Sequence, residues 1–589
     1  MIPNISIDHF SRVSVTPSGS IPEGCQSGCD PFGVVNLSTH VPRVSLRDPG
    51  LIAVTPSGSI PPRSIPKGFQ PVSGPNAHFD PFGVVDLSTH VPVTTWGSII
   101  CRFMVIFVGT SMLLGIARGD ELSGLGAAAA IESALVQTIA AAEKSVVAIA
   151  RVRKEQGGDS VRLESRPDPF GRRLAIGIPL QPTDPNFVPN EYGTGVVVDR
   201  RGLILTACHL LGDENDSYYI TTSDRRVYRA WIKAADPRSD LAILSIDGAD
   251  VASANLVPIR MGNAATLRKG QIVVSLGNPY AIARDGQSSA GWGIVSNLGR
   301  KAPPVADETD ASGKTTLHHF GGLIQTDAKL HLGTSGGPLL NLRGEMIGLC
   351  VSQAVTAGYE SSAGYAIPVD ATFRRVLNAL QQGREAEYGF LGILPANLQA
   401  AEIAAGLQGI RARIVQGTPA ARSALREDDI ITSVNGATIH DSDSLVLEVG
   451  RLPVEAVAHL GVIRNGTRQT IDVVLSKYPV RGRKIVSLRP EAWRGVRVDY
   501  ASAFLEPEQP QRFGLPMTDD AVVVSEVDPN TPAAQSGMKP GMLISHVDGR
   551  PVRTPKEFQA AIAEKRGAVQ LRRAASDPSN SVLIVPPGS

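Results

Sequence analysis

The stretch that decides the fold is Gln325-Thr-Asp-Ala-Lys-Leu-His-Leu-Gly333-Thr-Ser335-Gly-Gly-Pro-Leu-Leu-Asn341. Glycines lie close to Ser335 on both sides, and an apolar run follows them. Glycine adopts backbone conformations that other residues avoid, so this pattern predicts a tight turn that presents a serine. Such a turn also directs backbone N–H groups toward an oxygen that becomes negative during acyl transfer. The segment therefore predicts a serine nucleophile in a strand-rich domain.

Two earlier motifs supply the partners that a serine nucleophile needs. Gly193-Thr-Gly-Val-Val-Val-Asp199 and then Leu205-Thr-Ala-Cys-His209 read as two strands, the second ending at a histidine. Asp236-Pro-Arg-Ser-Asp240 precedes the apolar run Leu-Ala-Ile-Leu. A serine hydroxyl needs an imidazole to take its proton, and the imidazole needs a carboxylate to fix its tautomer.

These three motifs predict a catalytic triad. Ser335 would be the nucleophile, His209 the general acid and base, and Asp240 the residue that orients His209. The N–H groups of Gly333 and Ser335, with Thr334 between them, would form the oxyanion hole. Taken singly, a histidine after a strand, an aspartate before one and a glycine-rich turn each have a structural explanation. Together, in the order His, Asp, Ser, they match chymotrypsin-type enzymes.

The region around these motifs reads as all-β. Short apolar runs separated by Gly, Pro, Asn and Asp are typical of sandwiches and barrels. The expected strands are Val146–Ala150, Gly195–Asp199, Leu203–Thr206, Leu241–Leu244, Ile272–Leu276 and Met346–Cys350.

From about residue 135 to residue 585 the chain resembles the HtrA/Deg family of trypsin-like serine proteases with PDZ domains. Besides the three motifs, the matching residues are Gly277-Asn-Pro, Gly293-Ile-Val-Ser296 and Gly364-Tyr-Ala-Ile-Pro368. The resemblance implies a mainly β fold with two six-stranded barrels in a protease domain over residues 130–380. It also implies ATP-independent cleavage of unfolded or damaged envelope proteins, a homotrimer or higher multiple, and regulation by active-site loops.

Several residues depart from the family pattern or bear on specificity. Family members commonly have asparagine where Thr334 and Cys208 stand. The polar stretch 301–320 predicts a mobile loop in which His318 and His319 are solvated. The segment Gly364, Tyr365, Ala366 and Ile367 resembles the wall of the primary specificity pocket. It contains no acidic residue, which favours a small aliphatic side chain before the cleaved bond.

Two further units look like PDZ domains. The first, over residues 386–478, opens with Tyr388, Gly389, Phe390 and Leu391, which in that family offer backbone N–H groups to a peptide carboxylate while the next strand accepts the peptide. The second, over residues 488–586, repeats the pattern, but an insert from Ala501 to Pro516 interrupts its binding edge. The alternative for both is a spacer role.

The first hundred residues do not read as a domain. Val15-Thr-Pro-Ser-Gly-Ser-Ile-Pro22 recurs from Val54 to Pro61, and the Pro-, Ser- and Gly-rich stretch 1–95 is expected to be disordered. Residues 96–117 have the layout of a secretory signal, with a positive residue, a short apolar core and a small-residue site. A signal normally stands at the start of a chain, so our hypothesis is that translation begins near this segment. Residues 1–95 would then not be translated. A retained membrane anchor is the alternative to a cleaved signal.

Composition adds only exclusions. The formal net charge of +1 gives no reason to expect nucleic acid as a partner. The five cysteines show no metal-type spacing, and no cofactor motif occurs. Cys208 and Cys350 would remain after signal removal, either as buried thiols or as a disulfide.

The sequence thus predicts a periplasmic or otherwise secreted serine endopeptidase without metal or cofactor. Its expected partners are unfolded proteins and peptide C-termini. Two rivals remain: a scaffold or chaperone that binds exposed C-termini, and a regulatory protease that cleaves one dedicated membrane protein.

Overall fold

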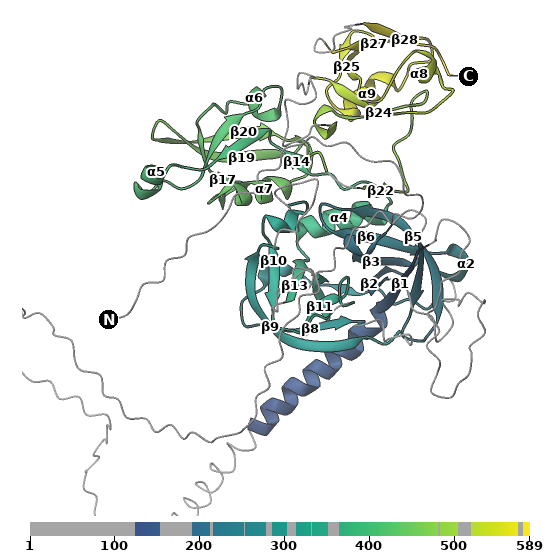
Figure 1. The fold of residues 1–589 in the computed structure, drawn as a ribbon, viewed down its shortest axis with the longest axis vertical. Helices are drawn as coiled ribbons and strands as arrows, with labels where there is room; N and C mark the ends of the chain where they lie inside the picture. Colours follow the sequence, from purple (N-terminus) through teal and green to yellow (C-terminus); the bar gives the residue numbers. More distant parts are fainter. Residues whose placement is uncertain are drawn as a thin grey trace, which may run out of the picture. The chain divides into compact units, whose positions relative to one another are not determined.

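Figure 1 shows the computed structural model of the chain. The structure describes residues 124–153, 191–212, 216–251, 254–278, 286–302, 314–331, 333–351, 364–480, 483–504, 520–574 and 581–588. The expectations for residues 1–95 and 96–117 therefore lie outside the described residues.

Six strands close into a first barrel in the order β5-β4-β1-β2-β3-β6, because β5 also pairs with β6. All pairings in the ring are antiparallel. β3 and β6 are buried along their whole length, which explains why they read as continuous apolar runs. The strands are β1 (Val146–Val152), β2 (Glu191–Asp199), β3 (Leu203–Ala207), β4 (Ser217–Thr221), β5 (Val227–Asp236) and β6 (Leu241–Ile246).

A second barrel follows, with strand order β11-β8-β9-β10-β13-β12 and closure between β11 and β12. A short strand, β7 (Arg260–Met261), joins β12 in parallel. The expected double barrel is confirmed. The ring strands are β8 (Ile272–Gly277), β9 (Ser289–Arg300), β10 (Leu323–Thr326), β11 (Pro338–Asn341), β12 (Glu345–Val351) and β13 (Gly364–Pro368).

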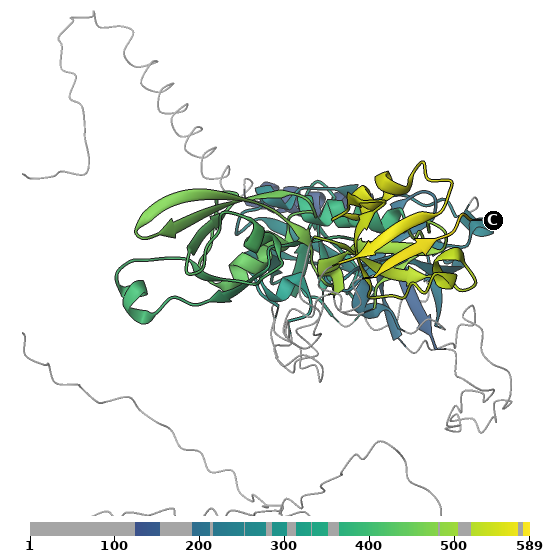
Figure 2. The same cartoon turned by 90° about the horizontal axis from the view of Figure 1, so that it is seen from above.

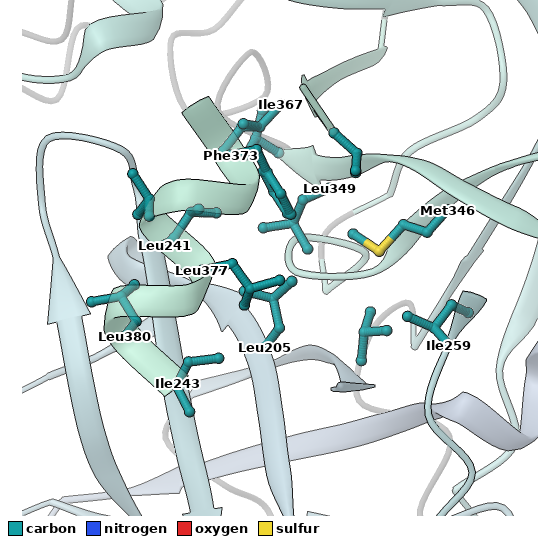
Figure 3. Packing of buried hydrophobic residues seen from close by; sticks show 14 of the residues in the cluster. Leu205, Leu241, Ile243, Ile259, Met346, Leu349, Ile367, Phe373, Leu377 and Leu380 are labelled. Atoms are coloured by element: carbon teal, nitrogen blue, oxygen red, sulfur yellow. The ribbon is translucent and has the colours of Figure 1, made fainter. Parts of the chain in front are cut away.

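Helix α4 (Ala371–Gln381) covers a core that contains residues of both barrels. Its N-terminus is capped by Asp370, whose side chain accepts a hydrogen bond from Phe373 N–H at 2.8 Å. Figure 3 shows Leu377 and Leu380 of α4 beside Leu241 and Ile243 of β6, and Phe373 beside Leu349 and Ile367 of the second barrel. The short helical elements of this domain are η1 (Glu143–Ser145), η2 (Cys208–Leu210), α2 (Gly248–Val251), η3 (Ala264–Thr266) and η5 (Leu317–His319).

A long N-terminal helix, Gly124–Ser145, precedes β1. In the described part of the chain it is the one helix long and apolar enough to cross a membrane, by length and composition. Its last turns pack on the barrels, since Ala142 is buried and the Thr138 hydroxyl donates to Leu342 O at 2.8 Å. Its first turns carry exposed apolar side chains, among them Leu125 and Ile131.

The first smaller module has its own core and sheet, in the order β15-β16-β17-β19-β20. A separate antiparallel pair, β14 (Gly389–Phe390) with β21 (Ser476–Lys477), joins the beginning of the module to its end. The remaining elements are β15 (Ile393–Ala396), α5 (Ala400–Ala404), β16 (Ile410–Ile414), α6 (Pro419–Arg422), β17 (Ile430–Val434), β18 (Ala437–Thr438), α7 (Ser442–Gly450), β19 (Val457–Arg464) and β20 (Thr467–Val474).

The second smaller module has the analogous order β23-β24-β25-β27-β28. Figure 2 shows the two sheets in green and yellow. The segment between the modules contains β22 (Ile485–Val486), which pairs with Ala235 and Ala234 of β5. The elements are β23 (Val496–Tyr500), η6 (Ala501–Phe504), β24 (Val522–Val527), α8 (Pro532–Gln535), β25 (Leu543–Val547), β26 (Arg550–Pro551), α9 (Pro555–Ile562), β27 (Val569–Arg573) and β28 (Val582–Val585).

The position of Phe373 makes the core testable. Phe373→Ala removes a buried ring from α4, so the double barrel should lose about 3–5 kcal/mol of unfolding free energy. Calorimetric melting of the purified protein measures this loss as a lower melting temperature. Asn378→Ala, at an exposed position of the same helix, is the matched control. Equal melting of the two variants would contradict this account of the core.

Candidate active site

His209 stands directly beyond a buried strand. β3 ends at Ala207, and His209 lies in the single turn η2 that follows. Because β3 is buried over its whole length, the backbone that carries the ring is fixed, while the side chain is 31% exposed. The backbone of His209 is therefore held in place, and its ring is accessible to solvent or substrate.

Asp240 lies at the start of the neighbouring strand, because β3 pairs with β6 and Ala207 is opposite Leu241. Its Oδ2 is 2.7 Å from His209 Nδ1, and its Oδ1 accepts a hydrogen bond from His209 N–H at 2.9 Å. The carbonyl of Asp240 accepts from Cys208 N–H at 2.9 Å. A carboxylate only accepts, so Nδ1 carries the hydrogen and Nε2 is left as the basic nitrogen.

The pair perturbs both titrations. Burial alone would lower the pKa of His209, but the charge and hydrogen bond of Asp240, with a smaller contribution from Glu191, raise it above the usual value. Burial alone would raise the pKa of Asp240, but the contacts with His209 lower it. The ionised carboxylate thus stabilises a protonated imidazole next to it.

Ser335 lies on a turn of the second barrel that packs against the first barrel. Thr194 N–H donates to Ser335 O at 3.0 Å, and Gly336 N–H donates to Cys350 O at 2.9 Å. Gly336 has φ +83°, and an added Cβ there would lie 2.1 Å from Thr194 O and 2.4 Å from Thr206 Oγ1. Only glycine fits, so the turn that carries Ser335 lies against the strands that lead to His209.

The expected oxyanion-hole residues have distinct environments. Gly333 has φ +92°, and its carbonyl accepts from Thr194 Oγ1 at 2.6 Å. Thr334 N–H donates to His331 O at 3.0 Å, so this N–H is engaged inside the loop. A contribution from the N–H groups of Gly333 and Ser335 stays a prediction.

The expected specificity segment forms β13, which pairs with β10 and β12. Gly364, Ala366 and Ile367 are buried, and Tyr365 is partly exposed. An added Cβ at Gly364 would lie 2.7 Å from the Leu330 side chain, so a larger residue there would displace Leu330. The role of the four residues in substrate selection stays a prediction.

The expected peptide-binding loop lies at the start of the first smaller module. Gly389 N–H donates to Leu452 O at 2.8 Å, and Leu391 O accepts from Ala420 N–H at 2.9 Å. The Phe390 ring meets Tyr478 edge-on, with ring centres 6.3 Å apart. Tyr388 is fully buried. Binding of a peptide by these residues stays a prediction.

The sequence patterns predicted for Tyr388 only a place in the peptide-binding loop. In the structure its hydroxyl donates a hydrogen bond to the carboxylate of Asp236. The same carboxylate oxygen accepts from Ser239 N–H at 2.9 Å and from Ser239 Oγ at 2.6 Å. Arg238, between them in sequence, lies over the Tyr478 ring at 3.6 Å. Asp236 therefore shapes the turn that leads to Asp240. The motif Asp-Pro-Arg-Ser-Asp contained it, but the tyrosine is 152 residues away.

The expectation that His318 and His319 are solvated is wrong. Residues 303–313 of that stretch lie outside the described residues, but residues 314–320 are described and packed. His319 is buried, with Nδ1 3.0 Å from both the N and the Oγ1 of Thr316. His318 contacts the carbonyl of Ser239 through Nε2 at 2.9 Å. Backbone contacts with the turn before Asp240 outweigh the polarity that suggested a solvated loop.

Metal and thiol chemistry find little support in the described ranges. No group of three or more His, Cys, Asp or Glu side chains there could hold a metal ion. Cys208 and Cys350 are both free thiols rather than a disulfide. Burial raises the pKa of each, to about 12 for Cys350, which makes both poor nucleophiles.

Family models match three segments of the chain. Residues 193–349 match the trypsin-like peptidase domain. Residues 389–475 and residues 523–572 each match a PDZ domain. The three matches follow one another in the order that the motifs predicted.

Curated relatives are named as serine endoproteases. A probable periplasmic serine endoprotease DegP-like from Pseudomonas fluorescens is 32% identical over 395 residues, which cover 65% of this chain and 76% of the relative. The periplasmic serine endoprotease DegP of Salmonella typhimurium is 28% identical over 400 residues, with coverage of 67% and 76%.

Solved structures give weaker similarity. The serine endoprotease from Yersinia pestis has a TM-score of 0.38 and 22% identity, and covers 58% of this chain and 97% of its own. The HtrA-type protease AlgW with a decapeptide has a TM-score of 0.41 and 23% identity, and covers 59% and 99%.

The contact between Asp240 and His209 predicts a measurable titration. In an NMR titration the His209 ring should show a pKa above 6.5. Asp240→Asn should lower that pKa, because the amide carries no charge to stabilise the imidazolium. The same His209 titration in both would contradict the electrostatic account.

Proposed function

Because this chain belongs to the HtrA/Deg family of serine endoproteases with PDZ domains, we propose that His209, Asp240 and Ser335 form its catalytic triad. The protein is a periplasmic serine endoprotease. The observation that carries the assignment of residues is the 2.7 Å contact between His209 Nδ1 and Asp240 Oδ2, next to a turn that only glycine at position 336 allows.

The mechanism follows from these positions. His209 Nε2 accepts the proton of Ser335 Oγ while the oxygen attacks the carbonyl carbon of the substrate. Asp240 holds the ring in the tautomer that leaves Nε2 basic and stabilises the imidazolium. Backbone N–H groups of Gly333 and Ser335 donate to the developing oxyanion. His209 then returns the proton to the leaving amine, and water hydrolyses the acyl-enzyme by the same steps.

Substrate binding adds a specificity wall and a peptide-binding module. Gly364, Tyr365, Ala366 and Ile367 would line the primary pocket and accept a small aliphatic side chain. The first PDZ domain would bind a C-terminus at the loop from Tyr388 to Leu391. β15 lies at the end of its sheet, and Leu394 on it is half exposed, which supports addition of a peptide strand.

The second PDZ domain fits a spacer role better. Its corresponding loop contains Arg494, whose guanidinium donates to carbonyls of Lys565, Gly567, Val585 and Pro586 at 2.6–3.0 Å. The neighbouring Trp493 ring packs edge-on against Phe558, with centres 6.1 Å apart. Both groups already have partners within the domain, so we assign peptide binding to the first PDZ domain.

The substrates we propose are unfolded or damaged proteins of the envelope, cleaved without ATP. A scaffold or chaperone without proteolysis, and a protease with one dedicated membrane-protein substrate, are the alternatives. The buried Asp240, hydrogen-bonded to His209, favours an enzyme, since burial of a charged carboxylate is costly and a scaffold does not need one that orients a histidine.

Casein digestion and labelling by a fluorophosphonate probe test the triad. The purified protein should digest unfolded casein and take up the probe, whereas Ser335→Ala should do neither. Asp240→Asn should lower kcat by about 10⁴-fold, because the wrong tautomer of His209 prevails. Digestion by Ser335→Ala at the wild-type rate, or a wild type that the probe does not label, would favour the scaffold.

The oligomer is a second testable part of the proposal. Exposed apolar side chains on the helix Gly124–Ser145, among them Leu125, Ile131 and Val136, favour burial against another subunit. Light scattering should give three times the chain mass or a higher multiple of it. Leu125→Glu and Val136→Glu together should shift the protein toward the monomer, and an unshifted trimer would remove this helix from the interface. Membrane association through residues 96–117 is likewise proposed as an alternative to a cleaved signal.

A further inference from the structure

A short segment of the second barrel lies along the turn that carries Asp240. Leu317 N–H donates to Arg238 O at 2.7 Å. The next residue, His318, contacts Ser239 O through Nε2 at 2.9 Å. Two consecutive residues of η5 therefore bind two consecutive carbonyls of the turn, directly before Asp240.

The chemistry of this contact fixes the state of the His318 ring. A carbonyl oxygen only accepts, so the hydrogen must be on Nε2. Burial lowers the pKa of His318, although the hydrogen bond to Ser239 and the charges of Asp240 and Asp370 oppose that effect, and Arg451 adds to it. The ring is thus neutral, with its single N–H aimed at Ser239 O.

The peptide unit between Ser239 and Asp240 controls where the carboxylate lies. Asp240 has φ +57°, a left-handed conformation that few residues other than glycine adopt. Its two carboxylate oxygens must meet both the N–H and the Nδ1 of His209. Rotation of the preceding peptide plane would move the carboxylate away from at least one of them.

We propose that His318 is a positioning residue for the proteolytic reaction, which holds the Ser239 carbonyl and thereby keeps Asp240 in the conformation that orients His209. The proposal rests on the catalytic roles given above. His318 touches neither substrate nor the reacting atoms, so it acts through the backbone of the turn.

The segment itself is held firmly enough to act as a support. Ala302 N–H donates to His318 O at 2.9 Å, and the Lys314 ammonium lies 2.8 Å from Asp443 of α7. Leu317 packs on Gly450, where an added Cβ would lie 2.8 Å from Leu317 Cδ1. Ala302 thus holds the segment from the end of β9, and α7 holds it from the first PDZ domain. The backbone of His318 is therefore fixed in place.

The opposite side of the turn is held independently. Ser239 donates to the Asp236 carboxylate through N–H and Oγ, and Tyr388 donates to the same carboxylate. A cavity of ≈ 30 Å³ beside the turn is lined by Ser239 and His318, among others. This space gives the peptide plane room to rotate once the His318 hydrogen bond is lost.

Four variants of the full-length protein test the proposal. His318→Leu removes the donor, and His318→Asn keeps an amide that is too short to reach Ser239 O. His318→Gln keeps an amide N–H at nearly the reach of Nε2. His319→Gln alters the adjacent buried ring, whose Nδ1 contacts Thr316, and is the matched control.

The readouts are kcat and KM on a chromogenic peptide, the pH profile of kcat/KM, and melting temperature. We expect His318→Leu and His318→Asn to lower kcat about ten- to hundredfold with little change in KM, because misplacement by about 1 Å costs rate rather than affinity. The acid limb of kcat/KM should move to lower pH, since a displaced Asp240 raises the pKa of His209 less. His318→Gln should retain most of kcat.

Two results would overturn the proposal. One is a kcat near the wild-type value in His318→Leu or His318→Asn. The other is an equal loss in His318→Gln and His319→Gln, which would show that packing of the segment matters and the hydrogen bond does not. If His318→Leu fails to fold, the comparison of Asn with Gln at this position still decides.

Failure of the proposed function gives a different pattern. If the triad assignment is wrong, wild type and Ser335→Ala digest casein equally and the fluorophosphonate probe labels neither. If only the role of His318 is wrong, labelling and digestion depend on Ser335, and the His318 variants match the wild type.

Discussion

The hydrogen bond between the Asp240 carboxylate and the His209 ring is the interaction on which the site depends. It forms because β3 and β6 are paired and buried, so the residue after one strand faces the residue before the other. It also requires a left-handed backbone at Asp240. A conformation that costs free energy persists only where neighbouring contacts hold it, and both sides of the Asp236–Asp240 turn supply such contacts.

The second barrel carries Ser335, the proposed nucleophile, on a turn whose backbone lies directly against the first barrel at Gly336. At Gly336 the backbone lies so close to Thr194 and Thr206 that a methyl group would collide with both. The close approach lets main-chain hydrogen bonds from Thr194 and Cys350 set the position of Ser335. The double barrel therefore positions the proposed site from two sides. The first barrel carries His209 and Asp240, and the second barrel carries Ser335.

Contacts between the catalytic domain and the first PDZ domain converge on the same turn. Tyr388 opens the PDZ domain and binds Asp236, while the segment with His318 rests on α7. Arg238 lies between the Tyr388 and Tyr478 rings, at 5.6 Å and 3.6 Å. Beyond the PDZ domain, β22 returns to extend the first barrel at β5. Segments that follow the catalytic domain in the sequence thus contact its first barrel at two places, the Asp236 turn and β5.

The sequence by itself indicated a strand-rich domain and the three residues of the proposed triad, and its resemblance to the HtrA/Deg family implied the double barrel and the two PDZ domains. Short apolar runs, glycines around Ser335 and the Asp-Pro-Arg-Ser-Asp motif are local patterns, and local patterns report strands, turns and the groups that they present. Only the tertiary structure decided that His318 is packed against Ser239, that Tyr388 binds Asp236 and that β22 joins the first barrel. Each of these joins segments that lie about 80 to 250 residues apart. Such contacts depend on the packing of whole domains, and no periodicity or spacing within one segment encodes them.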